Sequence, residues 1–128
     1  MKVTLRATKA NPANGELEEL EKDFDLPFAP YVGLKVLLSE DCKSERHNRL
    51  YKRSLEKHGP VVSPLFLLYD ALYIVESEKF LVKAGLHLRG NAGDQALHDA
   101  GVEQMVFGYG FTTWASRMEA MEIILDQF

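Results

Sequence analysis

The apolar positions near the start of the chain follow two periods. Residues 2–9 (KVTLRATK) alternate apolar and polar side chains, which is the pattern of a strand with one buried face. Residues 10–15 (ANPANG) have the proline, asparagine and glycine of a turn. In residues 16–24 the apolar positions are three and four apart, so this acidic segment is predicted to form a short helix.

The next two segments predict a strand and then a helix. Residues 31–39 (YVGLKVLLS) are apolar and partly β-branched, as strands are. The pattern of residues 45–59 (ERHNRLYKRSLEKHG) is helical, and the preceding residues 39–43 (SEDCK) are expected to start this helix, with Ser39 or Asp41 as its N-cap. Gly59, which is followed by a proline, is expected to end this helix.

The run 61–75 (VVSPLFLLYDALYIV) is apolar on all sides, so its period does not separate a buried helix from a strand. Ser63-Pro64 has the form of a helix start, which favours a helix at least through residue 72. The alternative is a pair of strands, formed by residues 72–77 and 80–86.

The last third of the chain predicts three further elements. A short helix over 93–101 is expected to be capped by Asp94 and closed by Gly101. Residues 102–111 (VEQMVFGYGF) are predicted to form a strand. A helix is predicted from Thr113 to the end. Its narrow apolar stripe consists of Trp114, Met118, Met121, Leu125 and Phe128.

These elements predict the fold class. The chain has 128 residues and no internal repeat, which suits one globular domain over residues 1–128 with one core. We predict an α+β fold, in which helices pack on a small mixed sheet of about three to four strands. A three-layer α/β arrangement is the alternative.

Composition and net charge disfavour several classes of protein. Hydrophobic residues are 46% and charged residues 27% of the chain, as in folded domains. The formal charge of −4 disfavours nucleic-acid binding. The single cysteine, Cys42, excludes an internal disulfide and suits a reducing compartment. The first residues lack the apolar run of a signal peptide, and 61–75 is shorter than the ~20 residues of a membrane span. We therefore expect a cytoplasmic protein that is not in a membrane.

The predicted helix over 45–58 has an unusual face. His47, Tyr51, Ser54 and His58 follow one another at steps of four, three and four, so they share one stripe. Two histidines eleven residues apart are separated by ~16 Å of helical rise and cannot bind one metal ion. The stripe is interpreted first as half-buried polar packing, then as a binding surface. Cations beside it form a basic edge, which consists of Lys43, Arg46, Arg49, Arg53 and Lys57.

Two further segments have candidate chemistry. Residues 16–25 contain six acids and one lysine, a charge opposite to that of the basic edge. Residues 87–101 place Gly90 and Gly93 before a predicted helix N-terminus, where backbone amides can bind an anion. Arg89, Asp94 and His98 are near in sequence, but no P-loop or dinucleotide fingerprint is present.

No motif of the sequence indicates catalysis, a metal or a cofactor. We therefore predict a small non-enzymatic binding protein that docks onto or masks a macromolecular partner, as inhibitors, immunity proteins and adaptors do. The partner is expected to be a protein, and self-association is left open. The predicted contact residues are Lys43, Arg46, Arg49, Arg53, Lys57, Glu16, Glu18 and Glu19.

The alternative is a small enzyme or sensor for a phosphorylated or nucleotide-like ligand. It requires the helical stripe and the glycine turn to converge on one cleft. The residues of that alternative site are His47, Tyr51, His58, Arg89, Gly90, Gly93, Asp94 and His98.

Overall fold

The computed structural model describes residues 1–40, 43–90, 94–113 and 122–127. The elements along the chain are β1 (Lys2–Ala10), β2 (Leu17–Asp25), β3 (Lys35–Leu37), α1 (Glu45–His58), β4 (Leu65–Ile74), β5 (Lys79–Gly85) and α2 (Gln95–Gly108). The prediction of an α+β fold is confirmed, with five strands in the sheet rather than three or four.

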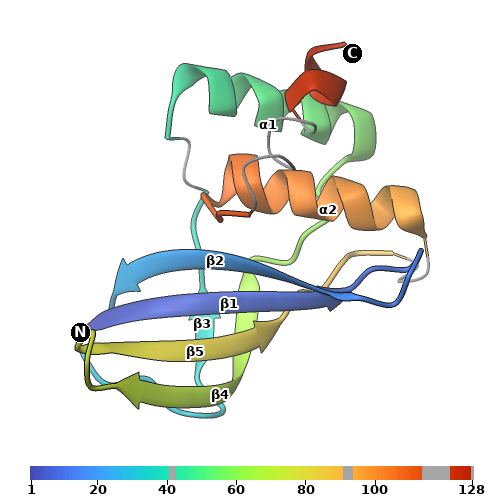
Figure 1. Ribbon diagram of the computed structural model, residues 1–128. Helices are drawn as coiled ribbons and strands as arrows, with labels where there is room; N and C mark the ends of the chain where they lie inside the picture. Colours follow the sequence, from blue (N-terminus) through green and yellow to red (C-terminus); the bar gives the residue numbers. More distant parts are fainter. Residues whose placement is uncertain (41–42, 91–93, 114–121, 128) are drawn as a thin grey trace.

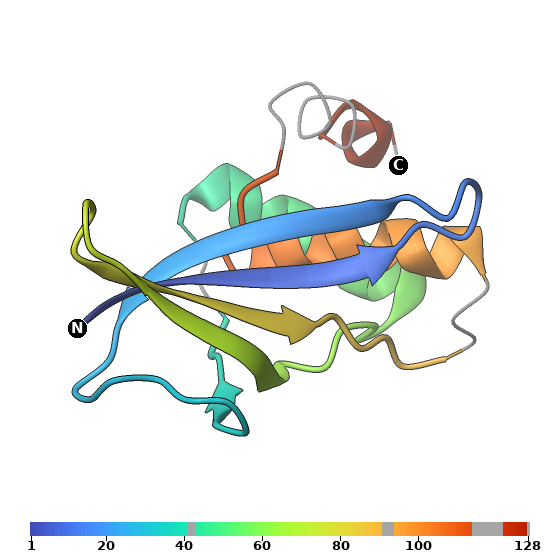
Figure 2. The same cartoon turned by 60° about the horizontal axis from the view of Figure 1, so that its bottom comes forward.

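The five strands form one mixed sheet in the order β2-β1-β5-β4-β3. β1 and β5 are parallel, and the other neighbouring pairs are antiparallel. Figure 1 shows α2 against one face of the sheet and α1 beyond α2, and Figure 2 shows the same sheet with both helices behind it. Both helices lie on the same side, so the fold is not the three-layer α/β alternative.

The strand predicted over 2–9 is confirmed as β1, but the helix predicted over 16–24 is wrong. This segment is β2, an antiparallel strand beside β1. Leu20 and Phe24 are four residues apart, an even number that places both on one side of a strand as well as of a helix. They lie opposite Ala7 and Val3 of β1 on the core side of the sheet. Leu17, at an odd spacing, points to the other side and is exposed.

The helix favoured over 63–72 is also wrong. The run forms β4, which pairs with β5, so the pair of strands is confirmed, but the first strand is Leu65–Ile74 and not 72–77. A β-bulge lies between Leu68 and Asp70, where the extra residue bends the strand. Figure 1 shows β4 changing direction between the part beside β3 and the part beside β5.

The helix predicted over 45–59 is confirmed as α1, but it begins at Glu45 and not within residues 39–43. Its N-cap is neither Ser39 nor Asp41 but Ser44, whose hydroxyl accepts a hydrogen bond of 3.1 Å from the His47 amide; Asp41 itself lies outside the described residues. Gly59 ends α1 as predicted, with a φ of 71° that favours glycine. The strand predicted over 31–39 is shorter, because β3 contains only three residues.

The second helix begins as predicted and continues further. Asp94 caps α2 by accepting hydrogen bonds from the amides of Ala96 and Leu97. The helix does not end at Gly101, and the strand predicted over 102–111 is wrong up to Gly108. Residues 100–108 are buried on every side between the sheet and α1. A helix buried all round has no polar face to show a helical period.

The helix predicted from Thr113 to the end falls mostly outside the described residues. Trp114, Met118, Met121 and Phe128 are among those outside. Within the described part, residues 122–126 are helical, and Leu125 is buried in the main core. No helix in the described ranges is long and apolar enough to cross a membrane.

The contact between the two helices depends on a glycine. A Cβ atom at Gly108 of α2 would lie 2.5 Å from the Cε1 atom of Tyr51 on α1. The Tyr51 ring is buried, packs edge-on against Tyr109 and donates a 2.8 Å hydrogen bond to Glu40. The ring therefore has little freedom to move away. Gly101 also makes a close approach, but to the flexible methyl end of Leu88.

We predict that Gly108→Ala lowers the free energy of unfolding by about 1–3 kcal/mol through overpacking, although alanine is the better helix former. Gly101→Ala is the matched control and should cost clearly less, since the Leu88 methyl group can rotate. Denaturant unfolding of both variants measures the difference. A Gly108→Ala protein as stable as the unmodified chain would contradict the tight contact at Tyr51.

Candidate functional site

The most unusual surface of the molecule is the face of the sheet that the helices leave uncovered. Side chains alternate across a strand, so β3 and β4 send every second residue to this face. Five large apolar side chains there are between 43% and 71% exposed. We call them the apolar strip; they are Leu37, Leu65, Leu67, Tyr69 and Leu72.

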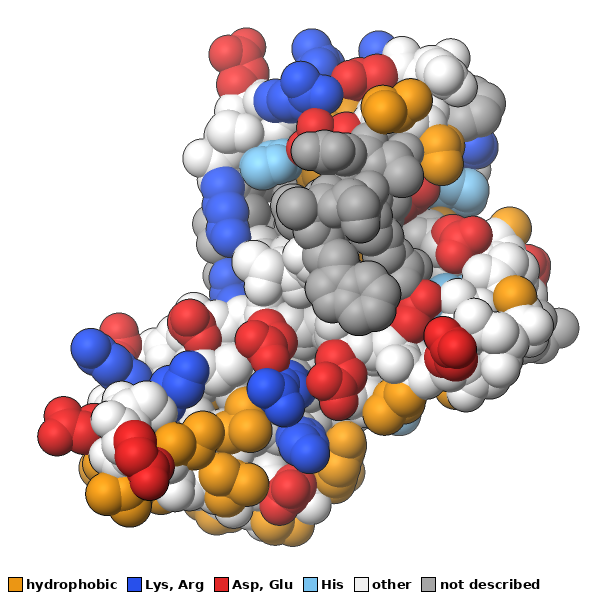
Figure 3. Space-filling model, in the orientation of Figure 1, with side chains coloured by type: hydrophobic (Ala, Val, Ile, Leu, Met, Phe, Trp, Pro, Cys, Tyr) orange, Lys and Arg blue, Asp and Glu red, His pale blue; other side chains and the backbone are white. Residues whose placement is uncertain are grey.

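The strand register places the residues of the apolar strip near one another. Leu37 of β3 lies directly opposite Leu65 of β4. Tyr69 occupies the bulge, and its hydroxyl is 3.3 Å from that of Thr8, so its ring reaches across β5 toward β1. Leu72 lies opposite Leu81 of β5. Figure 3 shows hydrophobic side chains gathered at the lower edge of the molecule, where β4 lies in Figure 1.

The other half of the same face is charged. Arg6 of β1 pairs with Glu21 of β2 across the strands, and the hydroxyl of Thr4 donates to Asp23. Glu19 is exposed on the same side of β2. The uncovered face therefore has a mainly apolar half over β3 and β4, which also includes Lys35 and Asp70, and an acidic border along β2.

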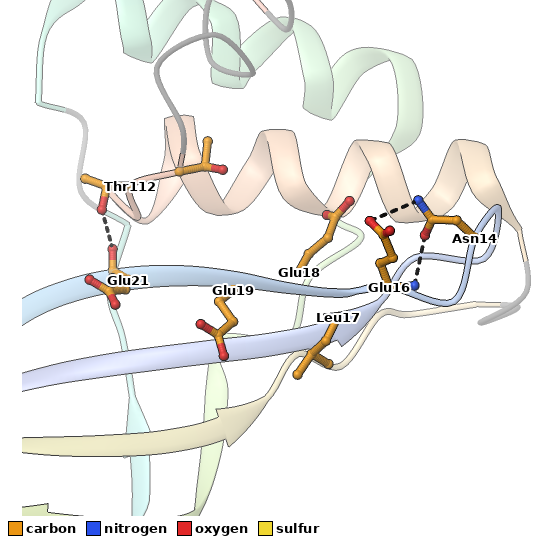
Figure 4. Close-up of a pocket in the computed structure, with 8 residues that line it drawn as sticks. Asn14, Glu16, Leu17, Glu18, Glu19, Glu21 and Thr112 are labelled. Carbon is orange, nitrogen blue, oxygen red and sulfur yellow. Dashed lines mark hydrogen bonds between the residues drawn. The ribbon is translucent and has the colours of Figure 1, made fainter.

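The acidic segment also lines a groove with a volume of about 400 Å³ at the edge of β2. Its lining residues are Asn14, Glu16, Leu17, Glu18, Glu19, Glu21, Thr112 and Thr113. Figure 4 shows Glu18 pointing toward α2 and Glu19 pointing away from it. Strand alternation thus divides the predicted acidic surface between the two sides of the sheet.

Glu18 of β2 and His98 of α2 contact each other between the sheet and the helix. The His98 ring is fully buried, and its Nε2 atom is 3.0 Å from an oxygen of Glu18. Asn11 donates a second hydrogen bond to the same carboxylate. His98 is therefore closed to solution, whereas Glu18 is partly exposed at the wall of the groove.

Three arginines of the basic edge contact residues 122–126. Arg46 contacts Glu122 at 3.0 Å and Asp126 at 3.1 Å, and Arg49 reaches Asp126 at 3.5 Å. Arg53 donates to the backbone oxygen of Leu125. The two lysines of the edge have other neighbours. Lys43 donates a hydrogen bond to the Gly110 carbonyl. Lys57 lies close enough to Glu103 to lower the pKa of that carboxyl.

The polar stripe of α1 lies mainly in the contact between the two helices. The His47 ring packs against Phe107, with 5.5 Å between ring centroids. Tyr51 is buried, and burial followed by the hydrogen bond to Glu40 raises its pKa, so the phenol stays protonated. Ser54 accepts a hydrogen bond from Gln104 of α2. His58 is exposed in the last turn, where desolvation and then Lys57 lower its pKa.

The glycine turn is at the opposite end of α2 from His47. Asp94 is the N-cap of α2, and the Arg89 amide donates to the Val61 carbonyl. Gly90 has a φ of 139°, and Gly93 lies outside the described residues. Because Phe107 is thirteen residues beyond Asp94, about 20 Å of helical rise separates the turn from His47. The structure does not bring these two parts of the alternative site together.

Within the described ranges, no group of three or more histidine, cysteine or acidic side chains is placed to bind a metal ion. Comparison of the chain with models of protein families, with curated proteins and with solved structures gives no match. The site must therefore be interpreted from its own residues.

Sequence reasoning did not identify the apolar strip, although a signal is present. An antiparallel strand with one solvated face alternates apolar and polar residues, yet residues 65–69 (LFLLY) are apolar at every position. The helix predicted for this run hides the signal, because a helix has no second sheet face that would need to be covered.

One buried acid outside these surfaces has a perturbed pKa. Glu103 of α2 is 7% exposed, and its Oε2 atom has no hydrogen-bond partner among the described residues. Burial raises the pKa of Glu103, while Lys57 lowers it and Asp99 raises it. Such acids are candidates for catalysis, but Glu103 lies in the helix layer and none of the three described pockets includes it.

We predict that Glu103→Gln becomes increasingly stabilising, relative to the unmodified chain, as pH rises from about 4 to 7. The folded-state pKa is raised above the unfolded one, so the folded chain binds the proton more tightly. This contribution to stability is present below the unfolded pKa and is lost as pH rises through the folded pKa. Glutamine never ionises and avoids the loss. Thermal unfolding of both proteins over this range gives the difference; a difference constant with pH would contradict the raised pKa.

Proposed function

We propose that the protein is a non-enzymatic binding protein that docks onto a protein partner through the uncovered face of its sheet. The observation that carries this proposal is the apolar strip on β3 and β4. Monomeric proteins rarely expose contiguous apolar patches larger than a few hundred Å², and larger patches with a polar border typically mark contact surfaces.

The distribution of side chains on this face fits such a role. Protein contacts commonly have an apolar, aromatic-containing centre and a polar rim. The strip supplies the centre, with Tyr69 in its bulge, and Arg6, Glu19 and Glu21 supply a charged border. In this proposal the apolar area contributes affinity, and the charged border contributes orientation and association rate.

The proposed contact surface differs from the one expected from charge alone. Arg46 and Arg49 are paired with the acids of residues 122–127, and Glu18 is paired with His98. Of the expected acidic contacts, Glu19 is exposed on the uncovered face and remains part of the proposal. Reversing the arginines would also release the end of the chain, so it is not a clean test.

We place the protein in the cytoplasm, because its lone cysteine suits a reducing compartment. Its acidic net charge favours a protein over a nucleic acid as partner. A phosphorylated or nucleotide-like ligand has less support, because His47 packs near the end of α2 that is about 20 Å from the glycine turn.

The test is native mass spectrometry of the chain purified gently from its own cells. We predict that a macromolecule, either another protein or a second copy, accompanies the unmodified chain at fixed stoichiometry. Replacement of two strip residues, Leu67→Glu with Leu72→Glu, should remove it. Glutamate at 67 lies opposite Lys35, so the sheet should tolerate the change.

The matched control is Lys52→Glu on the exposed side of α1, which changes the net charge by the same two units and should keep the complex. Thermal unfolding checks that all three proteins are folded. A chain that carries no macromolecule, or a complex that survives the two strip substitutions, would count against the proposal.

A further inference from the structure

Three arginines of α1 converge on residues 122–127, on the side of the molecule away from the apolar strip. Arg46, Arg49 and Arg53 follow one another at steps of three and four, so they form one row along the helix. Figure 1 shows the helical turn of residues 122–126, drawn in red, beside α1, and α2 between α1 and the sheet. This contact is therefore separate from the uncovered face of the sheet.

The arginine row contacts two acids that are one helical turn apart. Arg46 Nη2 is 3.0 Å from Glu122 Oε2 and 3.1 Å from Asp126 Oδ2. The other oxygen of Asp126, Oδ1, is 3.5 Å from Arg49 Nη2 and 3.9 Å from Arg53 Nη1. Three guanidinium groups thus share two carboxylates, which favours a helical segment with acids four residues apart.

One leucine anchors the same segment. Leu125 is 2% exposed and belongs to the main core, whereas Ile123 and Ile124 are 59% and 47% exposed. Arg53 donates a 2.9 Å hydrogen bond to the Leu125 carbonyl, and carbonyls at the end of a helix need such partners. The segment is therefore held through a glutamate, a leucine three residues later and an aspartate directly after the leucine.

These contacts have the properties of an association that can open. The side chains of Arg46 and Arg49 are 53% and 56% exposed, and ion pairs with such exposure contribute little and are screened by salt. Within residues 122–127 only Leu125 is buried. Segments with few buried apolar side chains open locally before the rest of a protein unfolds. Opening uncovers three cations beside an apolar site, which suits an acidic segment with an apolar anchor.

We infer that the arginine row is a docking site for an acidic helical segment of a partner protein, and that residues 122–127 occupy this site within the same chain. The partner segment has a glutamate, a leucine and an aspartate at the spacing of residues 122, 125 and 126. Residues 122–127 compete with the partner, so their contact with α1 is autoinhibitory. This surface is additional to the uncovered face and does not depend on the proposed function.

Fluorescence anisotropy tests the inference with a labelled alanine-based helical peptide, which keeps only the glutamate, leucine and aspartate at this spacing. The peptide is titrated at low salt with the full chain, up to hundreds of micromolar. Leu125→Ala with Asp126→Asn removes the competing contacts and leaves the arginines intact. We expect this variant to bind the peptide at least tenfold more tightly than the unmodified chain, because its site is no longer occupied.

Two further variants control for folding and for the segment itself. Glu122→Gln with Asp126→Asn keeps the buried leucine and should tighten peptide binding by about threefold or more, through the loss of the competing ion pairs. The matched control is Ile123→Ala, which shortens an exposed side chain of the same segment and should leave binding as weak as in the unmodified chain. Thermal unfolding checks that each protein is folded.

The arginines must carry the binding if the inference is correct. Adding Arg46→Gln and Arg49→Gln to the Leu125→Ala, Asp126→Asn chain should weaken peptide binding by about threefold or more. Folded releasing variants that bind the peptide no more tightly than the unmodified chain overturn the inference, and so does tight binding that persists without the two arginines.

The apolar strip provides an independent check. Leu67→Glu with Leu72→Glu should leave peptide binding unchanged, because the strip lies on the other side of the sheet from α1. A failure of the arginine site is therefore distinguishable from a failure of docking through the uncovered face. Peptide binding that requires the strip would contradict the site on α1.

Discussion

The helices α1 and α2 stack on one face of the sheet, and this one-sided packing determines which surfaces of the described molecule are exposed. α2 is buried between the sheet and α1, and Gly108 allows the Tyr51 ring to come close. The space between the sheet and α1 is therefore filled by α2. Among the described residues no helix covers the opposite face of β3 and β4, and its large apolar side chains are exposed.

The same packing places most of the polar stripe of α1 in the contact between the two helices. Tyr51 and Ser54 face α2, and Gln104 of α2 joins Ser54 to the Gly59 carbonyl and the Val61 amide. Buried polar groups are normally paired in this way. The stripe therefore stabilises the contact between α1 and α2, and the hydroxyls of Tyr51 and Ser54 make hydrogen bonds within the protein. The arginines beside it are paired with Asp126, whereas the large apolar side chains on the other face of the sheet are exposed.

The sequence was informative where its period was unambiguous or its caps were specific. β1, α1, Asp94 and Gly59 were predicted because alternation, a two-sided helix and cap residues have direct physical causes. The failures share one cause. Leu20 and Phe24 fit both periods, and residues 65–69 and 100–108 are apolar or buried on every side, so no polar face shows a period. The apolar strip could not be predicted, because its exposure depends on which side of the sheet the helices occupy.

The most direct test of the uncovered face is hydroxyl-radical footprinting of the complex purified from its own cells, compared with the isolated chain at low concentration. We predict that Leu67, Tyr69 and Leu72 are oxidised readily in the isolated chain and are protected in the complex. Side chains on the outer side of α1 should react equally in both. Equal reactivity of the strip in the two states would show that the face stays in contact with water, and would contradict its role as the contact surface.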